Sequence, residues 1–253
     1  MAQNDLTDPQ SFPRVGAILQ ARIGSTRLPG KALLPLPLGG SGTLLEQIIA
    51  RARRATLVAE VVVALPDSAA DLPLLQLTEE LGIRTLQGSE TDVLSRFNAA
   101  AEHFGFAVIV RLTADNPALD PLFIDEAVRA HLAAGADYTI TTGLPLGMNI
   151  EVVSASALLQ AHLEATAPAD REHVTPYLRQ RPEQFQLLTL ALATATPQAA
   201  GLRLTVDYPS DYALLHVLYS TLGPDFSLAD ILALTRRYPW LATVNAANPQ
   251  VHI

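Results

Sequence analysis

Apolar runs alternate with amphipathic stretches along most of the chain. Short runs rich in β-branched residues cover 15–19, 60–65 and 107–112, whereas 44–52 and 93–104 repeat their apolar positions at helical spacing. The run 107–112 is too apolar and too β-branched for a surface strand, so we expect a central parallel strand there. This order predicts an α/β fold in which strands and helices alternate.

The same two periodicities predict the remaining elements. Helices are expected over 72–81, 121–134, 156–166, 170–181, 210–222 and 227–237, and strands near 84–87, 137–142, 150–153, 185–191 and 202–206. The helix over 44–52 places its leucine and isoleucine side chains on one face, which leaves Arg51, Arg53 and Arg54 towards water. From Trp240 onward we expect a tail.

The loop over residues 21–31 follows the first predicted strand directly. It contains two glycines, one proline and three cations, namely Arg22, Arg27 and Lys31. A β-rich run that leads into such a loop presents backbone amides and positive charge to an anion. We interpret this loop as a cradle for a triphosphate.

Two familiar phosphate loops do not fit this segment. The Walker pattern has four residues between its first Gly and a Gly-Lys pair followed by Ser or Thr, but five residues separate Gly24 from Gly30, and Ala32 follows Lys31. The dinucleotide fingerprint Gly-x-Gly-x-x-Gly needs a different spacing, and here Pro29 lies inside the loop. Both patterns are therefore excluded.

The net charge of the chain also favours the loop over residues 21–31 as the anion site. The net charge is −8 at pH 7, so an anion must be captured by a local cluster of cations, and neither nucleic acid nor an anionic membrane is an expected partner. Of the 17 Lys and Arg residues, only Lys31 is a lysine. A compact ammonium in a chain that otherwise uses arginine favours a role in phosphate binding. The alternative is a solvated lysine that closes a turn.

Several classes of site are absent from the sequence. The chain has no cysteine, which excludes disulfides, thiolate metal sites and thiol nucleophiles. Residues 1–14 lack the apolar region of a signal peptide, and no later stretch has the length and apolarity of a membrane span. We therefore expect a cytoplasmic protein with a disordered or extended tip over 1–13 and a single domain over 14–253.

Asp115 and Asp207 each follow an apolar predicted strand and lie beside a turn that contains proline. In open α/β sheets ligands bind at the carboxyl ends of the strands, so both residues are candidates for a site. Two converging carboxylates would hold a divalent cation such as Mg²⁺, and a triphosphate would complete its oxygen ligands. Each Asp taken alone fits a helix N-cap or turn residue equally well, and their pairing across 92 positions is inferred.

Residues 21–36, ARIGSTRLPGKALLPL, resemble the N-terminal signature of the cytidylyltransferases that activate acidic sugars. The resemblance is to the acylneuraminate and keto-deoxyoctulosonate cytidylyltransferases, most closely to the branch called spore-coat polysaccharide biosynthesis protein F-like, and covers about residues 14–212. It implies a three-layer α/β/α fold with a mostly parallel central sheet, of the nucleotide-diphospho-sugar transferase (GT-A-like) type. It further implies CTP and an acidic sugar as substrates, Mg²⁺ as cofactor and a homodimer.

Later motifs extend the resemblance. The segment LTVDYPSD around Asp207 fits the family pattern closely, whereas Ala114 replaces the usual Gly before Asp115, and Asn149 replaces the usual Asp in GMNIEV. The resemblance implies Arg22, Lys31 and Asp115 as catalytic residues and Asp115 and Asp207 as metal ligands. It implies nucleotide contacts from Leu19, Ala21, Arg22, Gly24, Ser25, Arg27, Lys31, Gly88, Ser89, Asp92 and Thr113, and sugar contacts from Asn149, Glu151, Arg171 and His173.

Two of these matches have structural alternatives. The segment 88–94, GSETDVL, is explained nearly as well by a loop followed by a capped helix start. Arg171 could pair with the sugar carboxylate through its planar fork, but Arg171 and His173 also fit a helix surface with an ion pair to Glu172 or Asp170.

The hypothesis is a nucleotidyltransferase in which a sugar hydroxyl attacks the α-phosphorus of an NTP, most simply CTP, in the biosynthesis of a cell-surface polysaccharide or glycan. Three alternatives stay open. A glycosyltransferase that uses a nucleotide sugar would share the architecture, but it usually carries Asp-x-Asp at a strand end, and this sequence has none. A non-catalytic nucleotide-binding protein is motivated by Ala114 and Asn149, and an enzyme that acts on a sugar phosphate or polyol phosphate is the third.

Overall fold

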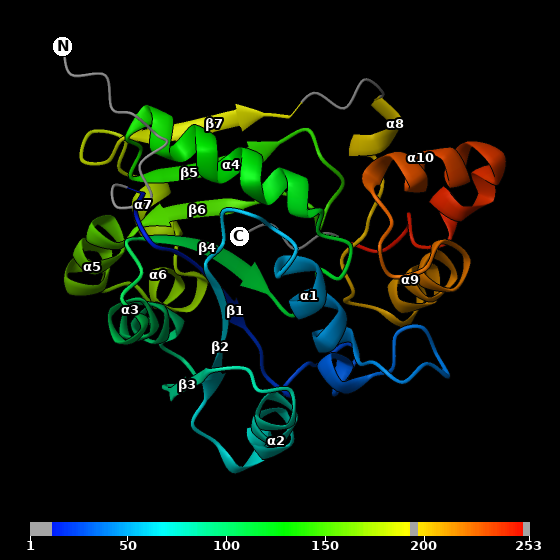
Figure 1. Cartoon of the computed structure of the whole chain (residues 1–253), viewed down its shortest axis with the longest axis horizontal. Coiled ribbons are helices and arrows are strands. Elements are labelled where there is room, and N and C mark those ends of the chain that lie inside the picture. Colours follow the sequence, from blue (N-terminus) through cyan, green and yellow to red (C-terminus); the bar gives the residue numbers. More distant parts are fainter. Residues whose placement is uncertain (1–11, 193–196, 250–253) are drawn as a thin grey trace.

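The computed structural model describes residues 12–192 and 197–249, so almost all of the tip predicted over 1–13 lies outside the described residues. One seven-stranded sheet crosses the molecule in the order β3-β2-β1-β4-β6-β5-β7 (Figure 1). Only β6 runs antiparallel to its neighbours, so the expected mostly parallel sheet is confirmed. The strands are β1 Val15–Gln20, β2 Glu60–Pro66, β3 Thr85–Gly88, β4 Val108–Thr113, β5 Tyr138–Thr142, β6 Glu151–Ser154 and β7 Leu187–Ala191.

Helices cover both faces of this sheet and make the three expected layers (Figure 1). Alternation along β1 shows the two sides, because Ala17 and Leu19 belong to one buried cluster and Ile18 to the other. Five helices contribute buried side chains to the first cluster, namely α1 Leu44–Ala52, α2 Leu72–Glu80, α4 Pro121–Ala134, α9 Pro209–Leu222 and α10 Leu228–Arg237. Helices α3 Val93–Phe104, α5 Ala155–Glu164 and α7 Pro176–Arg179 contribute to the second cluster, and α6 Pro168–His173 contacts α3 and α7. The short helix α8 Pro197–Ala200 follows β7 in the chain.

The prediction for Arg51 is wrong. Its side chain is buried in the fold, and its guanidinium donates to the carbonyl oxygens of Leu119, Pro224 and Phe226 at 2.6–2.7 Å. Those three carbonyls lie in loops far from α1 in the sequence, so a helix-face argument could not find them. Burial lowers the pKa of Arg51.

The carboxyl-terminal part differs from prediction in three places. Residues 202–206 are no strand, because this segment shares only an isolated bridge between Arg203 and Leu146. The helix expected over 170–181 is split into α6 and α7 at Val174, whose φ is +72°. The expected tail instead contains the 3₁₀ helix η3 Pro239–Thr243, with Leu241 and Asn245 buried.

Sheet order fixes where a ligand can bind. β1 lies between β2 and β4, and Gln20 at the end of β1 is in register with Thr113 at the end of β4. After β1 the chain continues to β2 on one side of this pair of strands, whereas after β4 it continues to β5 and β6 on the other side. The strand order therefore reverses between β1 and β4, and ligands of open α/β sheets bind at such a point. No helix among the described residues is long and apolar enough to cross a bilayer.

Candidate functional site

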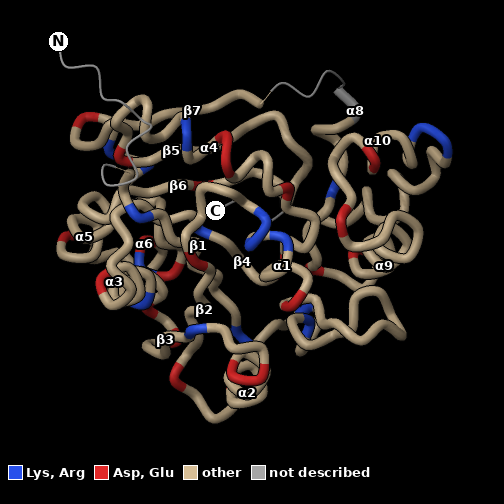
Figure 2. Tube along the Cα trace, viewed as in Figure 1, with Lys and Arg blue, Asp and Glu red and all other residues tan. Residues whose placement is uncertain are grey.

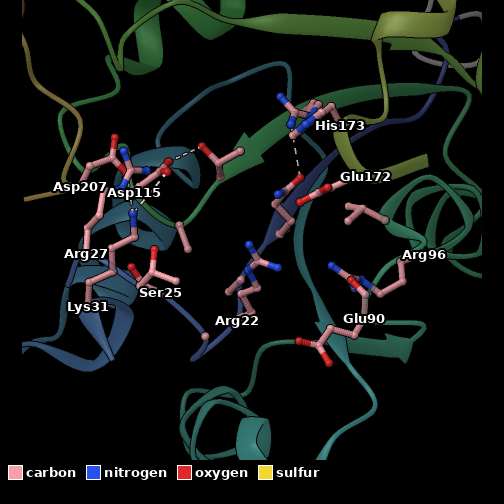
Figure 3. Close-up of a pocket in the computed structure, with 18 residues that line it drawn as sticks. Arg22, Ser25, Arg27, Lys31, Glu90, Arg96, Asp115, Glu172, His173 and Asp207 are labelled. Carbon is pink, nitrogen blue, oxygen red and sulfur yellow. Dashed lines mark hydrogen bonds and ion pairs between the residues drawn. The ribbon is translucent and has the colours of Figure 1, made fainter. Parts of the chain in front are cut away.

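A cleft of about 320 Å³ opens at the carboxyl ends of β1 and β4 (Figure 3). Lysine and arginine positions are spread along the whole trace among acidic ones (Figure 2), so the cleft draws its charge from local side chains. It is lined by Gln20, Ala21, Arg22, Gly24, Ser25, Thr26, Arg27, Lys31, Glu90, Val93, Arg96, Arg111, Thr113, Ala114, Asp115, Glu172, His173 and Asp207.

A side chain outside the loop after β1 helps to fix the shape of this loop. The carboxylate of Asp71 accepts a hydrogen bond from the backbone N–H of Ile23 at 2.7 Å. Gly30 has a φ of +67°, a left-handed conformation that favours glycine, and the 3₁₀ helix η1 Lys31–Leu33 begins directly after it. This turn carries the side chain of Lys31 into the cleft, where it is 13% exposed.

Lys31 joins the two aspartates predicted as a pair. Its ammonium donates to the carbonyl oxygen of Val206 at 2.6 Å, to Asp207 Oδ1 at 3.2 Å and to Asp115 Oδ2 at 3.4 Å. The aspartates are brought together because the backbone N–H of Val206 donates to the carbonyl oxygen of Asp115 at 2.7 Å. Lys31 is therefore no solvated turn residue.

This pair of carboxylates fits a divalent cation. Both offer hard oxygen atoms, and the Lys31 ammonium between them shows that a cation is accommodated where they converge. Residues 12–192 and 197–249 contain no group of three or more His, Cys, Asp or Glu side chains arranged to hold a metal. Two carboxylates with hard oxygen atoms are a donor set that Mg²⁺ uses when substrate phosphates supply further ligands.

Asp207 is also held by two arginines. Arg27 donates to its Oδ1 at 3.1 Å and Arg203 to its Oδ2 at 2.9 Å. Arg203 and its second partner, Asp211, are buried, and the Nε of Arg203 donates to Asp211 Oδ1 at 2.9 Å. Burial alone would raise the pKa of Asp211, but hydrogen bonds from Arg203 and from the N–H groups of Asp207 and Tyr208 lower it. The sequence signal for Asp211 was its spacing after Asp207, whereas Arg203 carried none.

Replacing Arg203 by methionine is expected to lower the free energy of unfolding by about 3 kcal/mol, because Asp211 would keep a buried charge without its ion-pair partner. Urea denaturation measures the change. Arg129→Met, which removes an exposed arginine from α4, serves as control and should change stability by less than about 0.5 kcal/mol. A loss below about 1 kcal/mol for Arg203→Met would contradict a structural role for this ion pair.

Arg111 of β4 also lines the cleft, although the sequence did not indicate it. Arg111 pairs with Glu151, whose Oε1 also accepts hydrogen bonds from the hydroxyls of Tyr138 and Thr175. Burial would raise the pKa of Glu151, but Arg111 and these hydroxyls hold it below its usual range. Glu151 therefore fixes Arg111 in place.

The predicted sugar contacts are distributed over three places. His173 lines the main cleft, whereas Asn149 and Glu151 line a neighbouring pocket of about 50 Å³ that shares Arg111 and Thr113 with the cleft. Arg171 lies in neither. Its guanidinium is bound to Asp92 and to the carbonyl oxygen of His162, so it makes neither of the helix-surface ion pairs considered from the sequence.

Four predicted nucleotide contacts do not line the cleft. Leu19 is buried in the core, and Asp92 accepts a hydrogen bond from the N–H of Ser95 at 2.9 Å, as expected for a capped helix start. Gly88 and Ser89 also lie outside the lining. The other seven predicted nucleotide contacts surround the cleft, namely Ala21, Arg22, Gly24, Ser25, Arg27, Lys31 and Thr113.

Comparison with known proteins gives concordant findings. Residues 16–231 match the model of a protein family described as Cytidylyltransferase. The chain is 38% identical to the spore coat polysaccharide biosynthesis protein SpsF of Bacillus subtilis, over 91% of this chain and 98% of that protein.

Two solved structures share the fold. A cytidylyltransferase from Leptospira borgpetersenii is 28% identical, covers 95% of this chain and 100% of its own, and superposes with a TM-score of 0.83. A CMP:2-keto-3-deoxy-manno-octonic acid synthetase complexed with CTP is 17% identical, covers 83% and 99%, and has a TM-score of 0.63. The second likeness concerns the fold alone.

Proposed function

Because this chain belongs to the cytidylyltransferase family, we propose that it transfers CMP from CTP to an acidic sugar, with release of pyrophosphate, for the biosynthesis of a polysaccharide. The observation that carries this proposal is the placement of Lys31 between Asp115 and Asp207 in a cleft that Arg22 and Arg27 also line. Cations of the loop and two carboxylates meet at one place, as the handling of a triphosphate requires.

The reaction depends more on neutralising the negative charge of the phosphate oxygens than on a general base. A hydroxyl oxygen of the sugar forms a bond to the α-phosphorus, the bond from that phosphorus to the bridging oxygen of the β-phosphate breaks, and the hydroxyl proton passes to solvent. Arg22 and Lys31 neutralise the negative charge that builds on the phosphate oxygens. Asp115 and Asp207 would hold Mg²⁺, which supplies further neutralisation and lowers the pKa of a hydroxyl.

A matrix of assays tests this function. Purified protein is incubated with Mg²⁺, each of the four NTPs and a panel of keto-deoxy and nonulosonic acids, and pyrophosphate is measured. We expect release with CTP and at least one acid, and none without an acceptor. Saturable CTP binding in a thermal-shift assay with no pyrophosphate from any acid would refute the proposed activity and favour the non-catalytic alternative.

Further assays separate the remaining alternatives. Pyrophosphate released only with a sugar phosphate or polyol phosphate would assign the enzyme to that group of nucleotidyltransferases. Transfer from a nucleotide sugar without use of an NTP would instead indicate a glycosyltransferase. The family resemblance also leads us to expect a homodimer, which light scattering after size exclusion measures.

A further inference from the structure

Arg96 is an unusual cation in the wall of the cleft. It projects from α3, is 2% exposed and lines the cleft. Its guanidinium donates to the carbonyl oxygens of Ser89 and Glu90, while its Nε is buried without a hydrogen-bond partner. No carboxylate of the described chain forms an ion pair with it. Its stem passes so close to Gly88 that a Cβ there would lie 2.9 Å from the Cγ of Arg96.

Arg22 faces Arg96 from the loop side of the cleft (Figure 3). Burial and then the positive charge of Arg22 lower the pKa of Arg96, and the charges of Asp71, Asp92 and Glu90 offset only part of this effect. Within residues 12–192 and 197–249, Arg22 makes no hydrogen bond or ion pair of its own. A buried cation without a counter-charge is costly. The pair therefore presents two cations without ion-pair partners to a cleft that Glu90 and Glu172 also line.

The other cations of the cleft are already balanced. Arg27 and Lys31 line the cleft and, together with the buried Arg203 behind Asp207, are paired with Asp115, Asp207 and Asp211, three positive charges against three negative ones. Arg111 is paired with Glu151. A triphosphate carries more negative charge than a sugar carboxylate, so two arginines without ion-pair partners favour the phosphate chain.

We propose that Arg96 is a second phosphate-binding arginine, which clamps the triphosphate against Arg22 from the opposite wall of the cleft. This inference rests on the proposed function, since it concerns the same nucleotide. Its guanidinium would contact a phosphate oxygen, while the carbonyls of Ser89 and Glu90 keep it aimed into the cleft.

Calorimetry with the full-length protein tests the proposal. CTP, CDP, CMP and cytidine are titrated into wild type, Arg96→Met and Arg96→Lys. We expect Arg96→Met to weaken CTP binding at least tenfold, about 1.4 kcal/mol, and to leave cytidine binding unchanged. Arg96→Lys should recover part of the loss because it keeps the charge. Arg129→Met, the exposed control on α4, should bind CTP as wild type does.

Other outcomes overturn the assignment. An equal loss for CTP and cytidine would mean that Arg96 only shapes the 88–90 loop. Unchanged CTP binding, combined with loss of the preference for an acidic sugar over its carboxamide, would assign Arg96 to the sugar carboxylate.

The wild type separates this inference from the proposed function. Binding needs no turnover, so a wild type that binds CTP but releases no pyrophosphate refutes the proposed activity alone. A wild type that binds no NTP refutes both proposals.

Discussion

Replacing Lys31 by methionine is expected to lower the rate of pyrophosphate release by about a thousandfold. Methionine keeps most of the aliphatic stem and removes the ammonium that lies between Asp115 and Asp207. Without it, the phosphate oxygens lose a positive charge in the transition state, and Asp115 and Asp207 lose the cation that lies between them. Initial rates at saturating CTP measure the effect, and the thermal midpoint shows whether the variant is folded.

Lys31→Arg is the sharper form of this test. A planar guanidinium is larger and its donors are fixed in a fork, so it should not replace a compact ammonium that serves Val206, Asp207 and Asp115 together. We expect this variant to recover less than a tenth of the wild-type rate. Near-normal turnover in Lys31→Met would remove Lys31 from the catalytic residues.

The chain offers a direct probe of this residue. Lys31 is its only lysine, so reductive methylation with ¹³C-formaldehyde labels a single ε-amine besides the terminal amine. The NMR signal of that amine should shift when CTP is added and stay unchanged with cytidine. A signal that does not shift when CTP is added would contradict contact between Lys31 and the phosphates, even if Lys31→Met and Lys31→Arg lose activity.

Asp115→Asn is expected to lower pyrophosphate release by about a hundredfold to a thousandfold. The amide keeps the size of the side chain and can still accept from the Thr113 hydroxyl, which donates to Asp115 Oδ1 at 2.5 Å in the wild type. It removes one of the two negative charges that would hold a divalent cation. The variant therefore tests the negative charge of Asp115 while the size of the side chain stays the same.

Binding of Mn²⁺ in the presence of CTP, followed by electron paramagnetic resonance, provides a readout besides activity. Asp115→Asn should weaken this binding, whereas Asp225→Asn, which changes a 76% exposed carboxylate paired with Arg54, should change neither binding nor rate. Unaltered Mn²⁺ affinity in Asp115→Asn would exclude Asp115 as a metal ligand. Wild-type activity in that variant would remove it from the site altogether.

The errors in prediction share a physical cause. Arg51 was predicted to face water because it is charged, although it shares the face of α1 that carries Leu44 and Ile48. The sequence does not show that carbonyl oxygens from distant loops meet its guanidinium. Asp92 and Arg171 are both charged residues in family motifs, but they bind each other and so fasten α6 to the start of α3. Arg203 lies in a segment mistaken for a strand, and its partner Asp211 comes from the next helix.

Local sequence by itself determined the alternation of strands and helices, the central place of β4 and the loop that carries Lys31, since each depends on nearby residues. Only the tertiary structure decided that Asp115 and Asp207 share one ammonium, that Arg111 is held by Glu151 and that Arg96 faces Arg22. These relations depend on which strands lie side by side and on which charges are already paired. Both are set by long-range packing and electrostatics, which no short stretch of sequence contains.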